Sequence, residues 1–314
     1  MSTHNLAVRH TIQQFFTICR RDGIQAAISR TIGFIGVQIK GFKSILMLLY
    51  LSKKDTVERE FYGSKMELDP SSSSAMEQKL ALGKKHEKES SDKFVEFLEQ
   101  IETKCEKDIY VFDVGANIGY YPLIEASILG DSANIYAIEP DPSNIEKLSK
   151  NLDLNEYDNI DILQAGLGSK ISQTNLDIQK NSNNNVVSDI NKGNNTKETI
   201  KVDIYPLDEL VEEYDLPPES PIVIRMDIEG YEKFALQGMK DILSTDRPIY
   251  MFLEIHDIVE DCREYVIDAL NKNCFSLEYV SYDGGSSVIP DNEFQNIMEV
   301  DQNTHIFVKK DSDN

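Results

Sequence analysis

The sequence contains few cysteines, and they are widely spaced. Cys19, Cys105, Cys262 and Cys274 include no Cys-x-x-Cys pair. This spacing offers neither a disulfide framework nor a structural zinc site. We therefore interpret all four as reduced thiols and expect a cytoplasmic protein.

The sequence also lacks a long hydrophobic run. The longest apolar stretch near the amino end, Ile45 to Leu51, has seven residues, whereas a helix needs about 20 to span a bilayer. It contains no convincing signal peptide either. We expect the chain to lie on a membrane surface at most, and not to cross it.

Positive charge is scarce outside the first 54 residues. The formal net charge is −22, which argues against a nucleic-acid partner because most of the surface would repel phosphates. Residues 1–54 nevertheless hold eight Lys and Arg against one acid. Two interpretations stay open: a basic arm that contacts an anionic membrane surface, or a helical hairpin packed on the acidic remainder.

From residue 108 onward, short apolar runs alternate with helical segments. This alternation predicts an α/β fold with a doubly wound, mostly parallel seven-stranded sheet. The expected strands are 109–114, 134–139, 160–165, 222–227, 249–255, 275–281 and 304–309. We assign 105–314 to this domain, 61–104 to a linker with charged helices, and 1–60 to a helical basic extension.

The connection from 166 to 221 interrupts the alternation. Extended pieces near 173–178 and 199–204 flank a stretch in which seven of residues 181–195 are Asn. We expect an inserted β-hairpin with a mobile tip, followed by a short helix from Leu207 to Tyr214.

A glycine-containing turn follows the first strand of the domain. Asp113 ends that strand, and Gly115 and Gly119 lead into a helix. In an open parallel sheet, ligands bind beyond the carboxyl ends of the strands. Glycine there lets the backbone approach a ligand, and the helix amino terminus points its N–H groups the same way. Alone, such a turn is better explained as a tight connection that binds nothing.

The second strand ends in Glu139-Pro140-Asp141, 26 residues after Asp113. An acid at this position can accept hydrogen bonds from both ribose hydroxyls. The dinucleotide fingerprint requires Gly-x-Gly-x-x-Gly, but Asp113 stands where its first glycine would be and no third glycine follows. An acid there suits a cofactor with a cationic amino-acid group, which favours S-adenosylmethionine (SAM) over NAD.

Six sequence blocks together resemble the FkbM-type methyltransferases, a SAM-dependent family with the class I, Rossmann-like fold. They occur in the family's order over about two thirds of the chain, at 113–121, 138–142, 165–168, 206–210, 225–232 and 253–256. One departure is Arg225-Met226, where the family has a Lys-apolar pair. Arginine keeps the charge but changes its geometry.

The resemblance implies a set of cofactor-binding positions. Asp113, Gly115, Asn117 and Gly119 should line the methionine end of SAM, with Ala116 and Tyr120 in the same turn. Glu139 should hold the ribose, and Pro140, Asp141 and Ala165 should lie near the adenine. The resemblance also implies O-methylation, often of a sugar hydroxyl.

Methyl transfer to a hydroxyl requires a base near the acceptor oxygen. The candidates end two central strands: Asp227 and Glu229 follow one, Glu254 and His256 the other. The ordinary pKa of histidine, about 6.5, suits a base at neutral pH. His256 could equally be a buried ring satisfied by its neighbours, and Asp227 could contact the cofactor or orient the substrate.

Asp227, Glu229 and Glu254 could also collect a hard divalent ion. Since Arg225 or backbone amides could hold such acids instead, we expect no metal. The sequence thus predicts a SAM-dependent O-methyltransferase with a sugar or glycan acceptor. Alternatives are a methyltransferase of non-sugar small molecules and a non-catalytic cofactor-binding protein of the same fold.

Overall fold

The computed structural model describes most of the chain beyond residue 54. The described residues are 17, 55–105, 108–179, 185–188, 190, 196–256, 258–282, 286–288, 294, 297 and 303–311. Of the expected basic extension, 1–60, only Thr17 and residues 55–60 are therefore described. The three-part division of the chain stays a prediction. Within the described residues, no helix combines the length and apolarity needed to cross a bilayer.

The chain forms two compact units, residues 1–59 with 67–86 and residues 60–66 with 87–314. Strands β1 (Val57–Phe61) and β2 (Ser64–Leu68) pair in a small sheet of their own. In the smaller unit, helix α4 (Ala75–Ala81) begins at Ser74, whose hydroxyl accepts a hydrogen bond from the Glu77 amide. The Glu77 carboxylate in turn accepts from the Asp69 amide, so the loop before the helix is tied to the first turn of the helix.

The larger unit is built on one sheet with the order β13-β12-β14-β11-β10-β3-β4-β5. Strands β3, β4, β5, β10 and β11 are parallel, and β14 runs antiparallel between β11 and β12. Their bounds are β3 Ile109–Val114, β4 Ala133–Ile138, β5 Ile160–Leu163, β10 Ile222–Met226, β11 Ile249–Ile255, β12 Ser276–Tyr282, β13 Ser286–Val288 and β14 Thr304–Lys310. All seven predicted strands are confirmed, and β13 is an additional edge strand.

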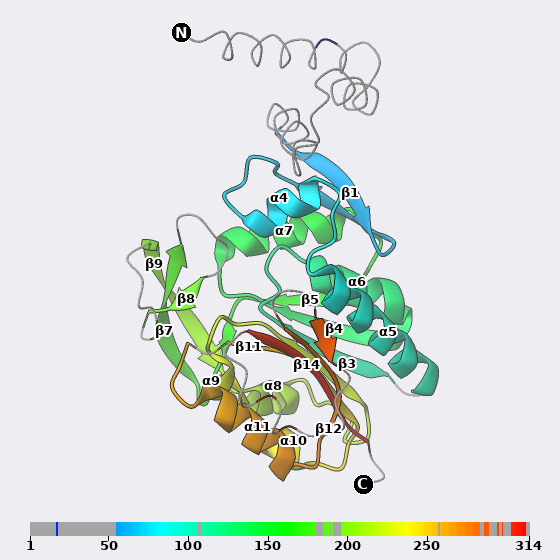
Figure 1. Ribbon diagram of the computed structural model, residues 1–314, viewed down its shortest axis with the longest axis vertical. Coiled ribbons are helices and arrows are strands. Elements are labelled where there is room, and N and C mark those ends of the chain that lie inside the picture. The colour runs from blue at the N-terminus through cyan, green and yellow to red at the C-terminus, as the bar shows by residue number, and fades with distance from the viewer. Residues whose placement is uncertain are drawn as a thin grey trace. The chain divides into compact units, whose positions relative to one another are not determined.

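Helices cover both faces of this sheet, which confirms the doubly wound class (Figure 1). On one face lie α5 (Lys88–Lys104), α6 (Tyr120–Leu129) and α7 (Pro142–Asp153). On the other lie α8 (Leu207–Glu213), α9 (Glu232–Gln237), α10 (Lys240–Ser244) and α11 (Cys262–Lys272). A 3₁₀ turn, η1 (Gly130–Ser132), links α6 to β4.

Alternate residues of each strand point to opposite faces of the sheet, and each face has its own apolar core. Phe112, Ile224 and Met251 belong to a large apolar cluster with α8–α11. On the opposite face, Phe94 of α5 stacks on Phe252 of β11 at a centroid distance of 5.1 Å. Polar strand residues on this second face are enclosed by α5 and α6, and several belong to the site described below.

The inserted segment confirms the predicted hairpin and extends it into a second sheet. Its order is β6-β9-β7-β8, with β6 at Gly166–Leu167, β7 at Ser172–Gln179, β8 at Val186–Val187 and β9 at Thr196–Tyr205. Buried Leu176, Val187, Val202 and Ile204 form its apolar core. The predicted short helix is α8. Most of the Asn-rich tip lies outside the described residues.

Candidate functional site

A cleft open to solvent lies at the carboxyl ends of β3, β4 and β10. One wall comes from the turns that follow these strands, and another from the inserted sheet. Its lining includes Gly115, Asn117, Glu139, Asn185, Asp227 and Glu229. The cleft thus lies where an open α/β sheet binds its ligands.

The glycine turn after β3 packs directly against the end of β10. Gly115 has a φ of +85°, and a Cβ atom at this position would lie 2.1 Å from the carbonyl oxygen of Asp227. The amides of Gly115 and Ala116 both donate to the carbonyl of Ile138, at 2.9 and 3.1 Å. Only glycine permits this approach, because it combines the left-handed conformation with the absence of a side chain.

Glu139 is anchored at the end of β4 with its carboxylate in the cleft wall. Its Oε2 accepts from the Asn117 amide at 2.9 Å, and its Oε1 accepts from the Asp141 amide at 2.9 Å and from Asn144 Nδ2 at 3.1 Å. Burial raises the pKa of Glu139 to about 7, although these hydrogen bonds oppose the rise. The carboxylate is therefore fixed in place and still has lone pairs for a ligand hydroxyl.

Asp113 does not reach the cleft with its side chain. The residue is fully buried, and its Oδ1 lies 3.3 Å from Nη1 of Arg225, the residue paired with it on β10. Burial raises the pKa of Asp113 to about 6 against the influence of Arg225. Asp113 therefore supports the turn from beneath, whereas the resemblance implied contact with the methionine end of SAM.

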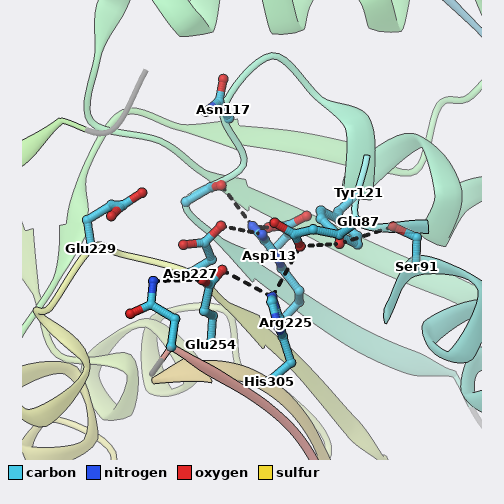
Figure 2. Close-up of polar contacts among 12 residues, drawn as sticks. Glu87, Ser91, Asp113, Asn117, Tyr121, Arg225, Asp227, Glu229, Glu254 and His305 are labelled. Atoms are coloured by element: carbon cyan, nitrogen blue, oxygen red, sulfur yellow. Dashed lines mark hydrogen bonds and ion pairs between the residues drawn. The ribbon is translucent and has the colours of Figure 1, made fainter. Parts of the chain in front are cut away.

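Arg225 joins the ends of β3 and β10 (Figure 2). Its guanidinium donates to the Gly115 carbonyl at 2.9 Å and to Asp227 Oδ2 at 2.8 Å, in addition to Asp113. It also lies 4.2 Å from the centre of the Tyr121 ring, a favourable cation–π distance. Of the three acids considered as metal ligands from the sequence, Arg225 holds Asp227, whereas Glu229 and Glu254 lie against His256.

Asp227 and Glu229 line the cleft after β10, which is separated by β3 from the strand that Glu139 follows. Their side chains are 22% and 21% exposed, enough for a ligand to reach them. Glu229 adopts a positive φ of +53°, which few residues other than glycine tolerate. Burial and the neighbouring Asp227 raise the pKa of Glu229 to about 8, and burial and Glu254 raise that of Asp227.

His256 is buried behind these two acids. Its Nδ1 lies 2.8 Å from Glu232, and its Nε2 lies 3.4 Å from Glu229 and 3.3 Å from Glu254. Burial disfavours the imidazolium, but hydrogen bonds to Glu232 and Glu254 prevail and raise the pKa of His256 to about 12. The ring is thus the satisfied buried histidine of the second interpretation, and an ordinary histidine pKa does not apply to it.

Glu254 connects His256 to a second buried histidine. Its Oε2 lies 3.2 Å from His305 on β14, which also lies 3.1 Å from Glu87 at the start of α5 (Figure 2). Burial opposes ionisation, yet hydrogen bonds from both histidines hold the pKa of Glu254 below its usual range. Glu254 is therefore a fixed anion in the interior.

Asp141 begins α7 and also contacts the inserted sheet. Its Oδ1 accepts from the amide and hydroxyl of Ser143, whereas Oδ2 accepts from Asn185 at 2.7 Å. Asn185 lines the cleft. This hydrogen bond ties the insertion to the main domain beside Glu139.

The structure brings together many of the residues that the sequence singled out. Among the expected cofactor residues, Gly115, Asn117, Glu139, Pro140 and Ala165 line the cleft, whereas Ala116, Gly119, Tyr120 and Asp141 stand beside or behind its lining. Sequence reasoning missed Glu232 as the partner of His256, although it closes the block at 225–232. It also missed His305, Glu87 and Asn185, for which no local motif exists.

The chain matches the family described as "Methyltransferase FkbM domain" over residues 113–277. It is 31% identical over 153 residues to the hexuronic acid methyltransferase AglP of Haloferax volcanii, covering 49% of this chain and 58% of that protein. The match thus spans less than two thirds of that relative.

Solved structures give more distant likenesses. A SAM-dependent methyltransferase from Agrobacterium tumefaciens has a TM-score of 0.46 at 9% identity, covering 82% of this chain and 70% of that one. M. jannaschii TYW2 in complex with AdoMet has a TM-score of 0.36 at 16% identity, covering 81% and 84%. Likenesses this slight do not bear on function. The family match spans more than half of the sequence, and the chain belongs to the FkbM methyltransferase family.

Proposed function

We propose that this protein is a SAM-dependent O-methyltransferase whose acceptor is a sugar or glycan hydroxyl. One observation carries the proposal: a fixed carboxylate, Glu139, and the acids Asp227 and Glu229 line one cleft, at the ends of β4 and β10 on either side of the glycine turn after β3. A nucleoside needs a fixed carboxylate for its ribose hydroxyls, and a hydroxyl-bearing acceptor needs a nearby carboxylate that can accept its proton.

The residues of the cleft fit SAM. Glu139 would accept hydrogen bonds from the ribose hydroxyls, since its oxygens are held by backbone amides and keep acceptor capacity. Gly115 lines the cleft, and its lack of a side chain lets the turn after β3 pack against the Asp227 carbonyl beside the cofactor position. Pro140 and Ala165 offer a small, flat surface for the adenine. When bound, SAM supplies the methyl group.

The β10 side of the cleft has the groups that an acceptor hydroxyl requires. Asp227 is held by Arg225 and can orient the hydroxyl as a hydrogen-bond acceptor. Glu229 is not tied to an arginine or lysine by any ion pair that the described residues form, and its carboxylate can accept the hydroxyl proton. His256 fixes the position of Glu229 from behind. We assign Glu229 as the base and Asp227 as the orienting group.

A sugar acceptor is supported by the relative from Haloferax volcanii, which is named for a hexuronic acid. Leu176, Val187, Val202 and Ile204 of the inserted sheet add an apolar wall to the cleft. Sugar rings present C–H faces as well as hydroxyls, so a cleft with one apolar and one acidic side suits them.

Binding and transfer test the proposal separately. Calorimetry should show that the purified chain binds SAM and S-adenosylhomocysteine, and NAD should not bind. Tritium from methyl-labelled SAM should then appear in fractionated glycans or glycolipids, and Glu229→Gln should abolish the transfer while SAM affinity stays. Absence of SAM binding would refute the proposal, and label found in a non-sugar product would refute the acceptor class.

A further inference from the structure

Three potential metal ligands meet at the acceptor side of the cleft. Single ligand atoms of Asp227, Glu229 and His256 all lie within 4.8 Å of one another. Asp227 and Glu229 follow β10, and His256 follows the neighbouring strand β11. Two carboxylate oxygens and one imidazole nitrogen are a donor set that divalent first-row ions accept.

The histidine of this group is held in the orientation that a ligand needs. Glu232 is buried, and its Oε1 lies 2.8 Å from Nδ1 of His256. The same oxygen accepts from the Gly230 amide at 3.0 Å, so the carboxylate cannot turn away. Nε2 is thereby directed at the acids. Metal-binding histidines commonly use their other nitrogen in this way, with a carboxylate that fixes ring and tautomer.

Asp227 provides an independent observation. Its Oδ2 accepts from Arg225, but its Oδ1 is enclosed and has no hydrogen-bond partner among the residues that the structure describes. A buried carboxylate oxygen without a partner loses its hydrogen bonds to water, and no hydrogen bond within the protein compensates for that loss. A bound cation would satisfy it.

The charges around the group also favour a cation. The connected set contains six carboxylates, and its basic side chains are Arg225, His256 and His305. The carboxylates are Glu87, Asp113, Asp227, Glu229, Glu232 and Glu254. His256 binds an ion only as the neutral imidazole, so the ion would take the place of its Nε2 proton. With the other eight groups charged, negative charge exceeds positive by four. Such an excess is costly in a partly buried site, and a divalent ion would offset half of it.

We propose that Asp227, Glu229 and His256 bind one divalent transition-metal ion, of the kind represented by Mn²⁺, at the acceptor end of the cleft. The ion site rests on the proposed methyltransferase function only in one respect, which is that this end of the cleft is assigned to the acceptor. An ion there would lower the cost of an alkoxide on the acceptor. Each carboxylate has two oxygens, so Glu229 can contact the ion with one and receive a proton on the other.

Mn²⁺ binding to the full chain tests the site without SAM or acceptor. The electron paramagnetic resonance signal of free Mn²⁺ reports binding directly. About 1 M KCl, where the Debye length is about 3 Å, suppresses loose binding to the acidic surface. We expect one Mn²⁺ per chain. Glu229→Gln and His256→Gln should each weaken binding about tenfold or more, and Glu232→Gln about 10- to 100-fold.

Two controls locate the ion. Glu213→Gln removes an exposed charge on α8 and should leave Mn²⁺ affinity unchanged. Glu87→Gln alters the neighbouring group of Glu87, Glu254 and His305 and should weaken Mn²⁺ binding less than Glu229→Gln does. Far-ultraviolet circular dichroism checks that each variant is folded. If His256→Gln does not fold, Glu229→Gln still tests the site, because position 229 is partly exposed.

The results separate this proposal from the proposed function. No stoichiometric Mn²⁺ binding, or binding that depends on Glu87 and not on Glu229, would refute the ion site. SAM affinity measured in parallel should stay within about threefold in Glu229→Gln, since Glu139 holds the ribose. Loss of SAM binding with intact Mn²⁺ binding would count against the proposed function alone.

Discussion

Asp113 and Arg225 are directly paired residues of the adjacent strands β3 and β10, and their side chains form a buried ion pair 3.3 Å apart. The pair lies beneath the glycine turn, and the same guanidinium also holds the Gly115 carbonyl and Asp227. One buried cation therefore sets the positions of both sides of the cleft. An arginine can do this because its planar fork of donors reaches several acceptors at once.

Replacing Arg225 by methionine should destabilise the fold. Removal of one partner from a buried ion pair leaves the other charge uncompensated, which costs about 3–5 kcal/mol. Urea denaturation would measure the loss. The free energy of unfolding of Arg225→Lys should lie between those of Arg225→Met and the wild type, because lysine keeps the charge but cannot reach three acceptors. As a control, Lys150→Met breaks the exposed Lys150–Glu146 pair and should cause no measurable change. Equal stability of Arg225→Met and wild type would contradict this account.

Sequence reasoning worked where a local pattern determines the structure. Each strand of the parallel core is a short apolar run, as in Ile222–Met226, and such runs are recognisable because both faces of a parallel sheet are buried. The turn at Gly115 and the acid at Glu139 were equally recognisable, because their spacing follows from one βαβ unit.

The failures concern the direction of side chains and contacts between distant segments. Asp113 ends its strand as expected, but strand alternation turns its side chain to the α6 side, where Arg225 meets it. His256 was placed correctly along the chain, yet its protonation depends on Glu232 and Glu254, whose proximity arises only in the folded chain. His305 and Glu87 are 218 residues apart and no motif links them.

Gly115→Ala should prevent the close approach of the turn to β10. An added Cβ would lie 2.1 Å from the Asp227 carbonyl oxygen, and the φ of +85° would be strained as well. Gly130 also has a positive φ, but a Cβ there meets nothing within 4 Å. Gly115→Ala should thus be less stable than Gly130→Ala by about 1–3 kcal/mol, the usual cost of overpacking. Similar thermal or urea stability of the two variants would exclude the steric explanation.

The affinity for SAM should rise with pH through about 7, where Glu139 ionises. The carboxylate is the form that accepts from two ribose hydroxyls. Binding at lower pH must therefore expel a proton, which weakens the apparent affinity by up to about tenfold per pH unit. Calorimetry between about pH 5 and pH 8 would measure this dependence. Glu139→Gln should bind SAM more weakly at neutral pH and lose the dependence. An unchanged pH profile in that variant would assign the titration to another group.

The same group should affect stability with the opposite sign. The pKa of Glu139 in the folded chain is raised, so its contribution to stability is fully present below its unfolded pKa of about 4.5 and is lost as pH rises through about 7. In the absence of SAM, Glu139→Gln should therefore gain stability relative to wild type as pH increases across this window. A stability difference that does not change with pH would show that burial does not raise the pKa of Glu139.

Asn185→Ala should accelerate release of SAM. Asn185 donates to Asp141 at 2.7 Å across the edge of the cleft, and this hydrogen bond ties the inserted sheet to the start of α7. A hydrogen bond to a charged group contributes roughly 1.5–3 kcal/mol. Its loss should raise the dissociation rate of SAM about tenfold or more, with a smaller effect on association. Stopped-flow displacement of SAM by S-adenosylhomocysteine would measure the rate.

Gln173→Ala is the matched control for this last change. It removes a side-chain hydrogen bond of 2.8 Å between Gln173 and Asp203, which lie on β7 and β9 within the inserted sheet and do not bridge the cleft. Its SAM dissociation rate should match wild type. If both variants release SAM at the wild-type rate, Asn185 does not hold the cleft closed. If both variants accelerate the release equally, the cause is the stability of the inserted sheet, because of these two hydrogen bonds the one from Asn185 spans the two walls and the one from Gln173 does not.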